Sequence, residues 1–226
     1  HTGLKVPVPS LSFIGLPWPG LGEGDLEGMA WENAFVAMKG RMQHEYPFTE
    51  WKGIDWDALE AKFRPRIKAA QDAKDDEAYY LALREFLYSI PDGHVGISDV
   101  PEYRLHAIGG GYGFALVRLD DGRVIACVVD KGGAAEKLGM KWGAELLSWN
   151  GRAMAESAAA VSVLWAPEPP ATPGDRVREQ YRLLTRAPVG TKARFTFKNP
   201  GDTATQTAEI EAYQDCLLYT SDAADD

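Results

Sequence analysis

A glycine-rich turn that runs straight into an apolar strand is the feature that most restricts how this chain can fold. The sequence reads Gly109-Gly-Gly-Tyr-Gly113 and continues directly as Phe114-Ala-Leu116. Because glycine adopts backbone conformations closed to other residues, such a turn can leave N–H groups unpaired and aimed in one direction. We therefore expect a carboxylate seat here, beside a strand edge that could pair with an extended peptide. The residues of this expected binding site are Gly111, Tyr112, Gly113, Phe114 and Ala115.

Size and composition indicate a folded protein of one large or two small domains, since 45% of the 226 residues are hydrophobic and 11% are aromatic. The formal net charge of −9, without any block of Lys or Arg, argues against a nucleic-acid partner. No apolar run approaches the roughly 18 residues of a membrane span. No His and Cys cluster has the spacing of a zinc site, so we expect neither metal nor cofactor. Cys127 is expected to be a buried thiol, with a bridge to Cys216 as the alternative.

The first half of the chain has the hydrophobic periodicity of helices. Residues 1–24 are rich in Pro and Gly and predict an extended arm. The periodicity then predicts helices over about 25–44, from Asp55 or Asp57 onward, and over 75–89. Pro65 is expected to kink or break the second of them. Residues 25–104 are therefore expected to form one helical domain.

From His106 onward the hydrophobic period changes to that of strands. Strands are expected over 113–119, 123–129, 144–149, 192–198 and 205–213, with helices over 133–139, 156–164 and 176–185. Residues 105–213 thus predict a second domain. The expected fold class is α+β, with a helical domain followed by a domain of antiparallel strands and two or three helices.

Three segments of the second domain resemble, in order, those of PDZ domains. Tyr112-Gly-Phe-Ala-Leu116 matches the carboxylate loop and its strand, residues 133–143 match the short helix and turn, and Leu146–Arg152 matches the next strand and turn. The resemblance implies a PDZ-like, partly open β-barrel that binds peptide or protein C-termini. It departs at Ala144, where an Asp usually stands, and over about 165–186, a long insertion. The alternative is that the glycines serve only a tight turn.

The helical domain ends in Pro91-Asp-Gly-His94, followed by Val-Gly-Ile97. This ending and the stretches 53–60 and 63–67, placed ahead of a PDZ-like domain, resemble the N-terminal half of tail-specific (C-terminal-processing) serine peptidases, in particular the tricorn-like subgroup. The resemblance implies a serine endopeptidase that grips substrate C-termini with its PDZ domain. In that family the catalytic core with the nucleophilic serine follows the PDZ domain. The resemblance also implies a periplasmic or secreted bacterial protein.

His94 is the residue for which this resemblance implies a catalytic role. In tricorn-type members the histidine at the matching position takes the proton of the nucleophilic serine, a task that suits imidazole because it titrates near neutrality. The tricorn pattern has a serine just before this histidine, where this chain has Gly93. From the residues alone, His94 could instead cap the last carbonyls of a helix.

No serine of this chain suits the role of nucleophile. Ser89, Ser148 and Ser162 fall in expected helices or PDZ-like elements, outside any Gly-x-Ser-x-Gly turn. We therefore expect the chain by itself to be an inactive fragment of an endopeptidase, with a non-catalytic PDZ scaffold or regulatory module as the alternative. The tail, 214–226, changes abruptly in composition, and within it Cys216–Asp226 looks like a translated, non-native sequencing adapter of a metagenomic assembly. The alternative is an ordinary acidic terminus.

Overall fold

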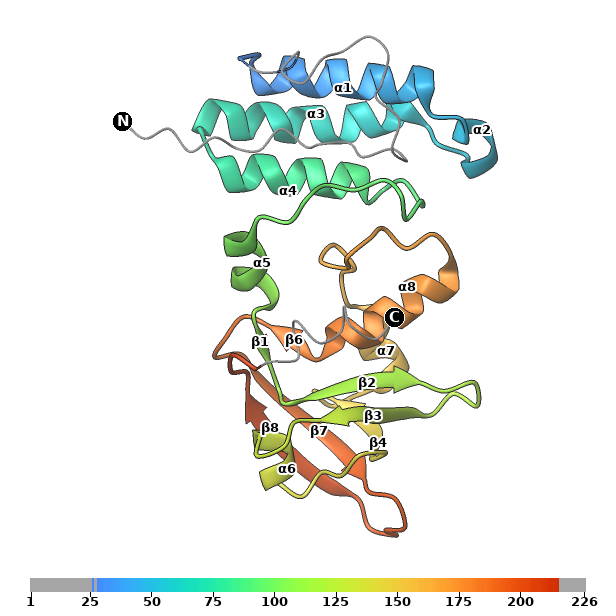
Figure 1. The fold of residues 1–226 in the computed structure, drawn as a ribbon, viewed down its shortest axis with the longest axis vertical. Coiled ribbons are helices and arrows are strands. Elements are labelled where there is room, and N and C mark those ends of the chain that lie inside the picture. Colours follow the sequence, from blue (N-terminus) through green and yellow to red (C-terminus); the bar gives the residue numbers. More distant parts are fainter. Residues whose placement is uncertain (1–25, 27, 216–226) are drawn as a thin grey trace. The chain divides into compact units, whose positions relative to one another are not determined.

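The computed structural model describes residue 26 and residues 28–215, which belong to two compact units (Figure 1). The first unit comprises the described residues up to 98 together with 167–171, and the second comprises 99–166 and the described residues from 172 onward. The expected arm and residues 216–226 of the expected tail lie outside the described residues. Within the described part, no helix is both long enough and apolar enough to cross a membrane.

Helices build the first unit. They are α1 (Trp31–Glu45), α2 (Thr49–Lys52), α3 (Trp56–Ala73) and α4 (Asp76–Leu87). The starts of α3 and α4 are fixed by Asp55 and Asp75, whose side chains accept hydrogen bonds from the N–H groups of Ala58 and Ala78. Such a cap contributes about 1 kcal/mol to stability. The three longer helices confirm the predicted N-terminal helical region.

Pro65 lies inside α3 without ending it, so the predicted break in this helix is wrong. A proline in a helix interior costs roughly 3 kcal/mol, because it removes a backbone hydrogen bond and crowds the preceding turn. The burial of Phe63 and Ile67, both 0% exposed, offsets this cost, since each such side chain contributes about 1.5–3 kcal/mol. Packing on the neighbouring helices therefore keeps α3 continuous through Pro65.

Phe86 of α4 lies at the centre of the aromatic core of the first unit. Its ring packs edge-on against Phe35 of α1 and Phe63 of α3, with ring centroids 5.1 and 5.8 Å away. Edge-to-face pairs of this kind stabilise a core beyond the burial of apolar area alone. The three helices are thus held together through one fully buried ring.

A buried arginine ties the segment after α4 to the helix. Arg84 is only 1% exposed and donates hydrogen bonds to the hydroxyls of Tyr80 and Tyr88 and to the carbonyl oxygen of Ile97. The Tyr80 hydroxyl donates in turn to the carbonyl oxygen of Ser98. The backbone at residues 97 and 98, shortly after His94, is therefore held against α4.

The second unit is built around an antiparallel sheet (Figure 1). Its strands are β1 (Gly110–Gly111), β2 (Phe114–Arg118), β3 (Val124–Val129), β4 (Glu145–Trp149), β5 (Arg152–Ala153), β6 (Arg186–Ala187), β7 (Lys192–Lys198) and β8 (Gln206–Glu211). The strand order is β2-β3-β4-β7-β8, with β5 beside β4, and β1 pairs separately with β6. Its helices are α5 (Pro101–Ile108), α6 (Ala134–Lys137), α7 (Met154–Ala159) and α8 (Pro173–Leu184). The two units together confirm the α+β class, and the second is consistent with a PDZ-like domain.

The core of the second unit lies where α8 covers the sheet. The Trp149 ring stacks on the Phe195 ring at 5.5 Å, and Phe114 of β2 lies 5.1 Å from the same Phe195 ring. Tyr181 and Leu184 of α8 belong to the same buried cluster. α8 therefore packs beside β2, one of the two edge strands of the sheet among the described residues.

Two segments of the second unit differ from the expectation. The first is 101–108, which forms α5, although strand-like periodicity was expected from His106 onward. Pro101 suits the start of this helix, because its fixed φ and missing N–H cost nothing at that position. The segment 165–186, expected to be an insertion, contains α8, whose start is capped by the Thr172 side chain. The expected helix over 176–185 is present and begins earlier, at Pro173, and this helix is part of the core of the second unit.

Replacing Phe86 with Ala is expected to lower the free energy of unfolding of the helical unit by about 3–5 kcal/mol, because the cavity would lie where three helices meet. Phe48→Ala, at a side chain that is 42% exposed, should cost less than about 1 kcal/mol. Guanidinium titrations followed by circular dichroism measure both values. Equal losses in the two variants would contradict the assigned core.

Candidate functional site

His94 lies in the short segment after α4, with its side chain 75% exposed. Its backbone N–H donates to Oδ1 of Asp92 at 3.0 Å, and its ring Nδ1 lies 3.2 Å from the same oxygen. A neutral imidazole that donates through Nδ1 carries its free lone pair on Nε2. Because a carboxylate oxygen only accepts, the contact with Asp92 favours a proton on Nδ1, while the rest of the ring is open to solvent.

Asp92 has the opposite environment, since its side chain is only 10% exposed. Its second oxygen accepts a hydrogen bond from the Tyr46 hydroxyl at 2.5 Å. Burial pushes the pKa of the Asp92 carboxyl upward, but the hydrogen bonds from Tyr46 and His94 and the charge of Lys52 outweigh it, so its pKa lies below the usual value. The pKa of Tyr46 is raised, first by burial and then by the adjacent carboxylate. Asp92 is thus a buried anion whose two oxygens are both engaged.

The carbonyls at the end of α4 are satisfied without His94. The N–H of Tyr88 bonds to the carbonyl of Arg84, the N–H of Ser89 to that of Phe86, and the N–H of Ile90 to that of Leu87. The contact found for the His94 ring is to a carboxylate instead. The interactions expected of a helix-capping histidine are therefore supplied by the backbone.

Gly93 stands where the tricorn pattern has a serine, and the structure gives a reason for its small size. A Cβ atom at this position would lie 3.1 Å from Oε2 of Glu168, which belongs to the 167–171 loop of the same unit. A carboxylate therefore lies against the residue that precedes His94. Tyr46 and Glu168 are far from His94 in sequence, and sequence reasoning missed both. The spacing of Asp92, two residues before His94, was the one sequence signal that could have indicated a partner for the His94 ring.

The three serines considered as nucleophiles each form bonds elsewhere. The Ser89 hydroxyl donates to the carbonyl of Glu85, the Ser148 hydroxyl lies 2.7 Å from that of Thr196, and the Ser162 hydroxyl accepts from a neighbouring backbone N–H. Within the part of the chain that the structure describes, no group of three His, Cys, Asp or Glu residues could hold a metal ion.

The glycine loop is buried, and residues of the chain itself lie against it. The N–H of Gly111 donates to the carbonyl of Tyr213 at 2.9 Å, and the N–H of Tyr213 returns the bond at 3.0 Å. Gly113, with φ +79°, donates its N–H to Oδ2 of Asp215 at 3.3 Å. The N–H groups of Gly111 and Gly113, which were expected to face a ligand, thus donate to the segment from Tyr213 to Asp215. Tyr112 and Phe114 are buried in the core, and Ala115 pairs with β3.

The close approach of that segment explains the glycines. A Cβ at Gly111 would overlap the Asp215 carboxylate, and one at Gly113 would overlap the Tyr213 hydroxyl. The second oxygen of Asp215 accepts from Arg186 of β6 at 2.7 Å. Sequence reasoning missed both members of this ion pair, because they lie far from the loop in the sequence.

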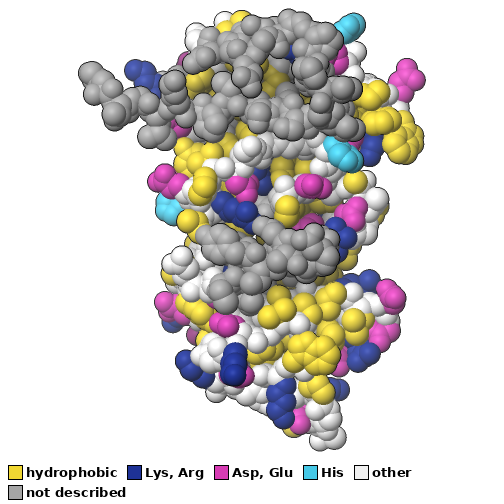
Figure 2. All heavy atoms as spheres, in the orientation of Figure 1, with side chains coloured by type: hydrophobic (Ala, Val, Ile, Leu, Met, Phe, Trp, Pro, Cys, Tyr) yellow, Lys and Arg dark blue, Asp and Glu magenta, His cyan; other side chains and the backbone are white. Residues whose placement is uncertain are grey.

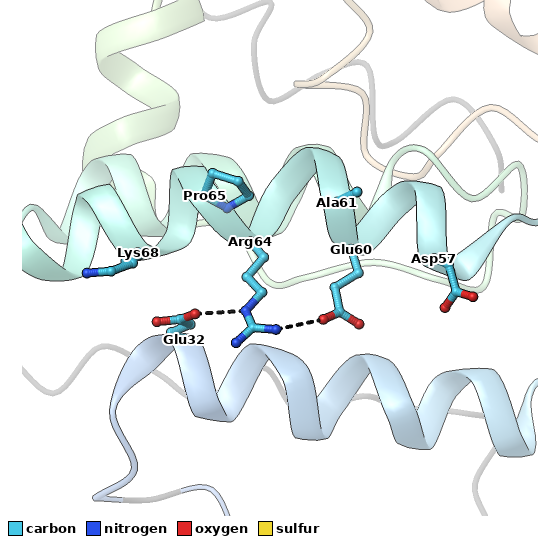
Figure 3. A pocket seen from close by; sticks show the side chains of 7 residues that line it. All are labelled: Glu32, Asp57, Glu60, Ala61, Arg64, Pro65 and Lys68. Carbon is cyan, nitrogen blue, oxygen red and sulfur yellow. Dashed lines mark hydrogen bonds and ion pairs between the residues drawn. The ribbon is translucent and has the colours of Figure 1, made fainter.

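A surface hollow along α1 and α3 includes neither the residues around His94 nor those around Asp215 (Figure 3). It is lined by Glu32, Asp57, Glu60, Ala61, Arg64, Pro65 and Lys68. Arg64 lies between Glu32 and Glu60 and donates to both carboxylates, at 2.7 and 3.1 Å. On the face drawn in Figure 2, Lys and Arg side chains lie among Asp and Glu rather than in one basic patch.

Tyr46→Phe is expected to destabilise the helical unit by about 1.5–3 kcal/mol at pH 7, the usual worth of a hydrogen bond to a charged group. Because the pKa of Asp92 is depressed in the folded protein, this stabilisation is present above the unfolded pKa of about 3.9 and disappears as the pH falls through the folded value. Denaturation at several pH values measures it, with Tyr79→Phe as the control. A loss that persists undiminished at pH 2 would contradict the assignment.

Comparison with known proteins gives a family match in the helical unit. Residues 29–81 match the family model of the Tricorn protease C1 domain. Among solved structures the chain is similar to the photosystem II D1 C-terminal processing protease, with 16% identity and a TM-score of 0.34, over 83% of this chain and 44% of that protein. The chain thus spans less than half the length of that protease, and no curated protein matches it. The predicted tricorn-like resemblance is confirmed for residues 29–81, which are similar to the Tricorn protease C1 domain.

Proposed function

We propose that this chain is the base-bearing and substrate-gripping part of a tail-specific serine endopeptidase. The observation that carries the proposal is the exposed His94 ring, whose Nδ1 lies against the buried, ionised Asp92. The match of residues 29–81 to the Tricorn protease C1 domain supports the same assignment. The nucleophilic serine and the oxyanion donors lie in a catalytic core outside this chain. A periplasmic or secreted location is part of this proposal and rests on the family resemblance.

The geometry suits a histidine that moves one proton in two steps. Nε2 of His94 takes the proton of the serine hydroxyl as its oxygen attacks the scissile carbonyl, and the imidazolium then gives that proton to the leaving amine. Asp92 stays ionised throughout, because its hydrogen bonds favour the charged form. Its anion holds the ring orientation and stabilises the imidazolium. Tyr46 acts on the ring only through Asp92.

The second unit supplies the proposed grip on the substrate. β2 pairs with β3 on one side, and α8 packs beside it, so its outer edge is the place where an extended peptide could add as a further strand. Backbone pairing along β2 would give affinity without much sequence preference. The glycine loop at the start of β2 would then receive the terminal carboxylate. This is the arrangement that recognises peptide or protein C-termini.

The test uses the reading frame extended past Asp215 through a downstream core. His94→Ala is expected to lower kcat for peptide hydrolysis about 100- to 10,000-fold, the usual contribution of a general base. His106→Ala, at an exposed histidine of α5, should leave kcat within about twofold. The chain of 226 residues alone should hydrolyse nothing. Full activity of the His94 variant would refute the proposed base, and a frame without a serine-dependent activity would favour a peptide-binding scaffold.

A further inference from the structure

The carboxylate of Asp215 lies where a ligand carboxylate was expected. Its side chain is completely buried, and the side chain of its partner Arg186 is 6% exposed. One oxygen lies at the Gly113 N–H and the other at the Arg186 guanidinium. The site therefore presents a backbone donor and a buried cation to a single carboxylate. This combination is that of a carboxylate-binding site already filled from within.

We propose that Gly113 and Arg186 form a carboxylate seat in which Asp215 acts as an internal pseudo-ligand, displaced when the terminal carboxylate of a bound peptide takes its place. This inference rests on the proposed function, because it assumes that β2 receives peptide C-termini. It adds Arg186 as the side chain that selects an anionic terminus. It also makes residues 213–215 a competitor of the substrate.

The chemistry of the seat requires an exchange rather than a simple departure. A guanidinium buried without a counter-ion is strongly unfavourable, so Asp215 can leave Arg186 only when another carboxylate arrives. An exchange of one carboxylate for another keeps both the charge and the hydrogen bonds. A neutral or amidated peptide end offers no such replacement. The seat is therefore selective for free C-termini.

The chain around Asp215 is arranged so that this exchange needs little movement. Tyr213 is held by its pair of backbone bonds to Gly111, and its hydroxyl accepts from the N–H of Ala134. Gln214, the next residue, is exposed. Asp215 therefore reaches into the seat from an anchored point, so its carboxylate competes at a high effective concentration. Displacement can stop at Gln214 and leave the Tyr213 pairing intact.

Chemical rescue tests the seat directly in this chain. Asp215→Ala is expected to lower the melting temperature by several degrees, and sodium acetate should restore it in a concentration-dependent way, since a ligand that binds only the folded state stabilises it. Acetamide and equal ionic strength of sodium chloride should not. Asp121→Ala, which removes an exposed carboxylate from Arg123, is the matched control and should show no acetate effect. If Asp215→Ala does not fold, Asp215→Asn takes its place.

Peptide binding provides the second arm. A fluorescein-labelled pool of random decapeptides with free C-termini should bind Asp215→Asn at least tenfold more tightly than the unaltered chain, and the amidated pool should bind neither. Arg186→Met should abolish binding in both backgrounds. Acetate rescue no greater than in the Asp121 control would overturn the seat. Rescue without any peptide affinity would keep the carboxylate seat and overturn the exchange, together with the proposed grip on C-termini but not the proposed role of His94.

Discussion

The buried Asp92 carboxylate is the contact on which the candidate catalytic arrangement depends. One oxygen accepts from Tyr46, beyond the end of α1, and the other from the backbone and ring of His94. The same anion therefore ties the helical core to the turn and sets the direction of an exposed imidazole. Because both oxygens are engaged, ionised Asp92 is favoured despite its burial. A solvent-facing ring on a rigid, charged support is what a proton-transfer role requires.

A second close approach organises the sheet unit. The segment from Tyr213 to Asp215 lies against Gly111 and Gly113 so tightly that neither position has room for a side chain. The positive φ of Gly113 and its bond to Asp215 arise from the same contact. The glycine run that marks this sequence is therefore explained by the chain's own packing. The proposed carboxylate exchange builds on that packing and uses the same donors.

Much of the fold could be predicted because its signals are local. Asp55 and Asp75 begin their helices as N-caps, and the alternation over 192–198 appears as a strand. The break expected as one outcome at Pro65 is absent, because the local cost of the proline is outweighed by packing that the sequence does not display. The candidate site was only partly predictable. His94 was singled out through its motif and stays a candidate. Its indirect link to Tyr46, through Asp92, and the pairing of Asp215 with Arg186 join residues far apart in the chain.

Covalent trapping of the proposed base tests the central claim most directly. A peptidyl chloromethyl ketone, bound as a substrate by a serine peptidase, places its reactive carbon beside Nε2 of the histidine that serves the nucleophile. In the protein extended past Asp215, mass spectrometry of the inactivated enzyme should find the alkyl group on His94. Inactivation with the label on another histidine, or with His94 unmodified, would contradict the account.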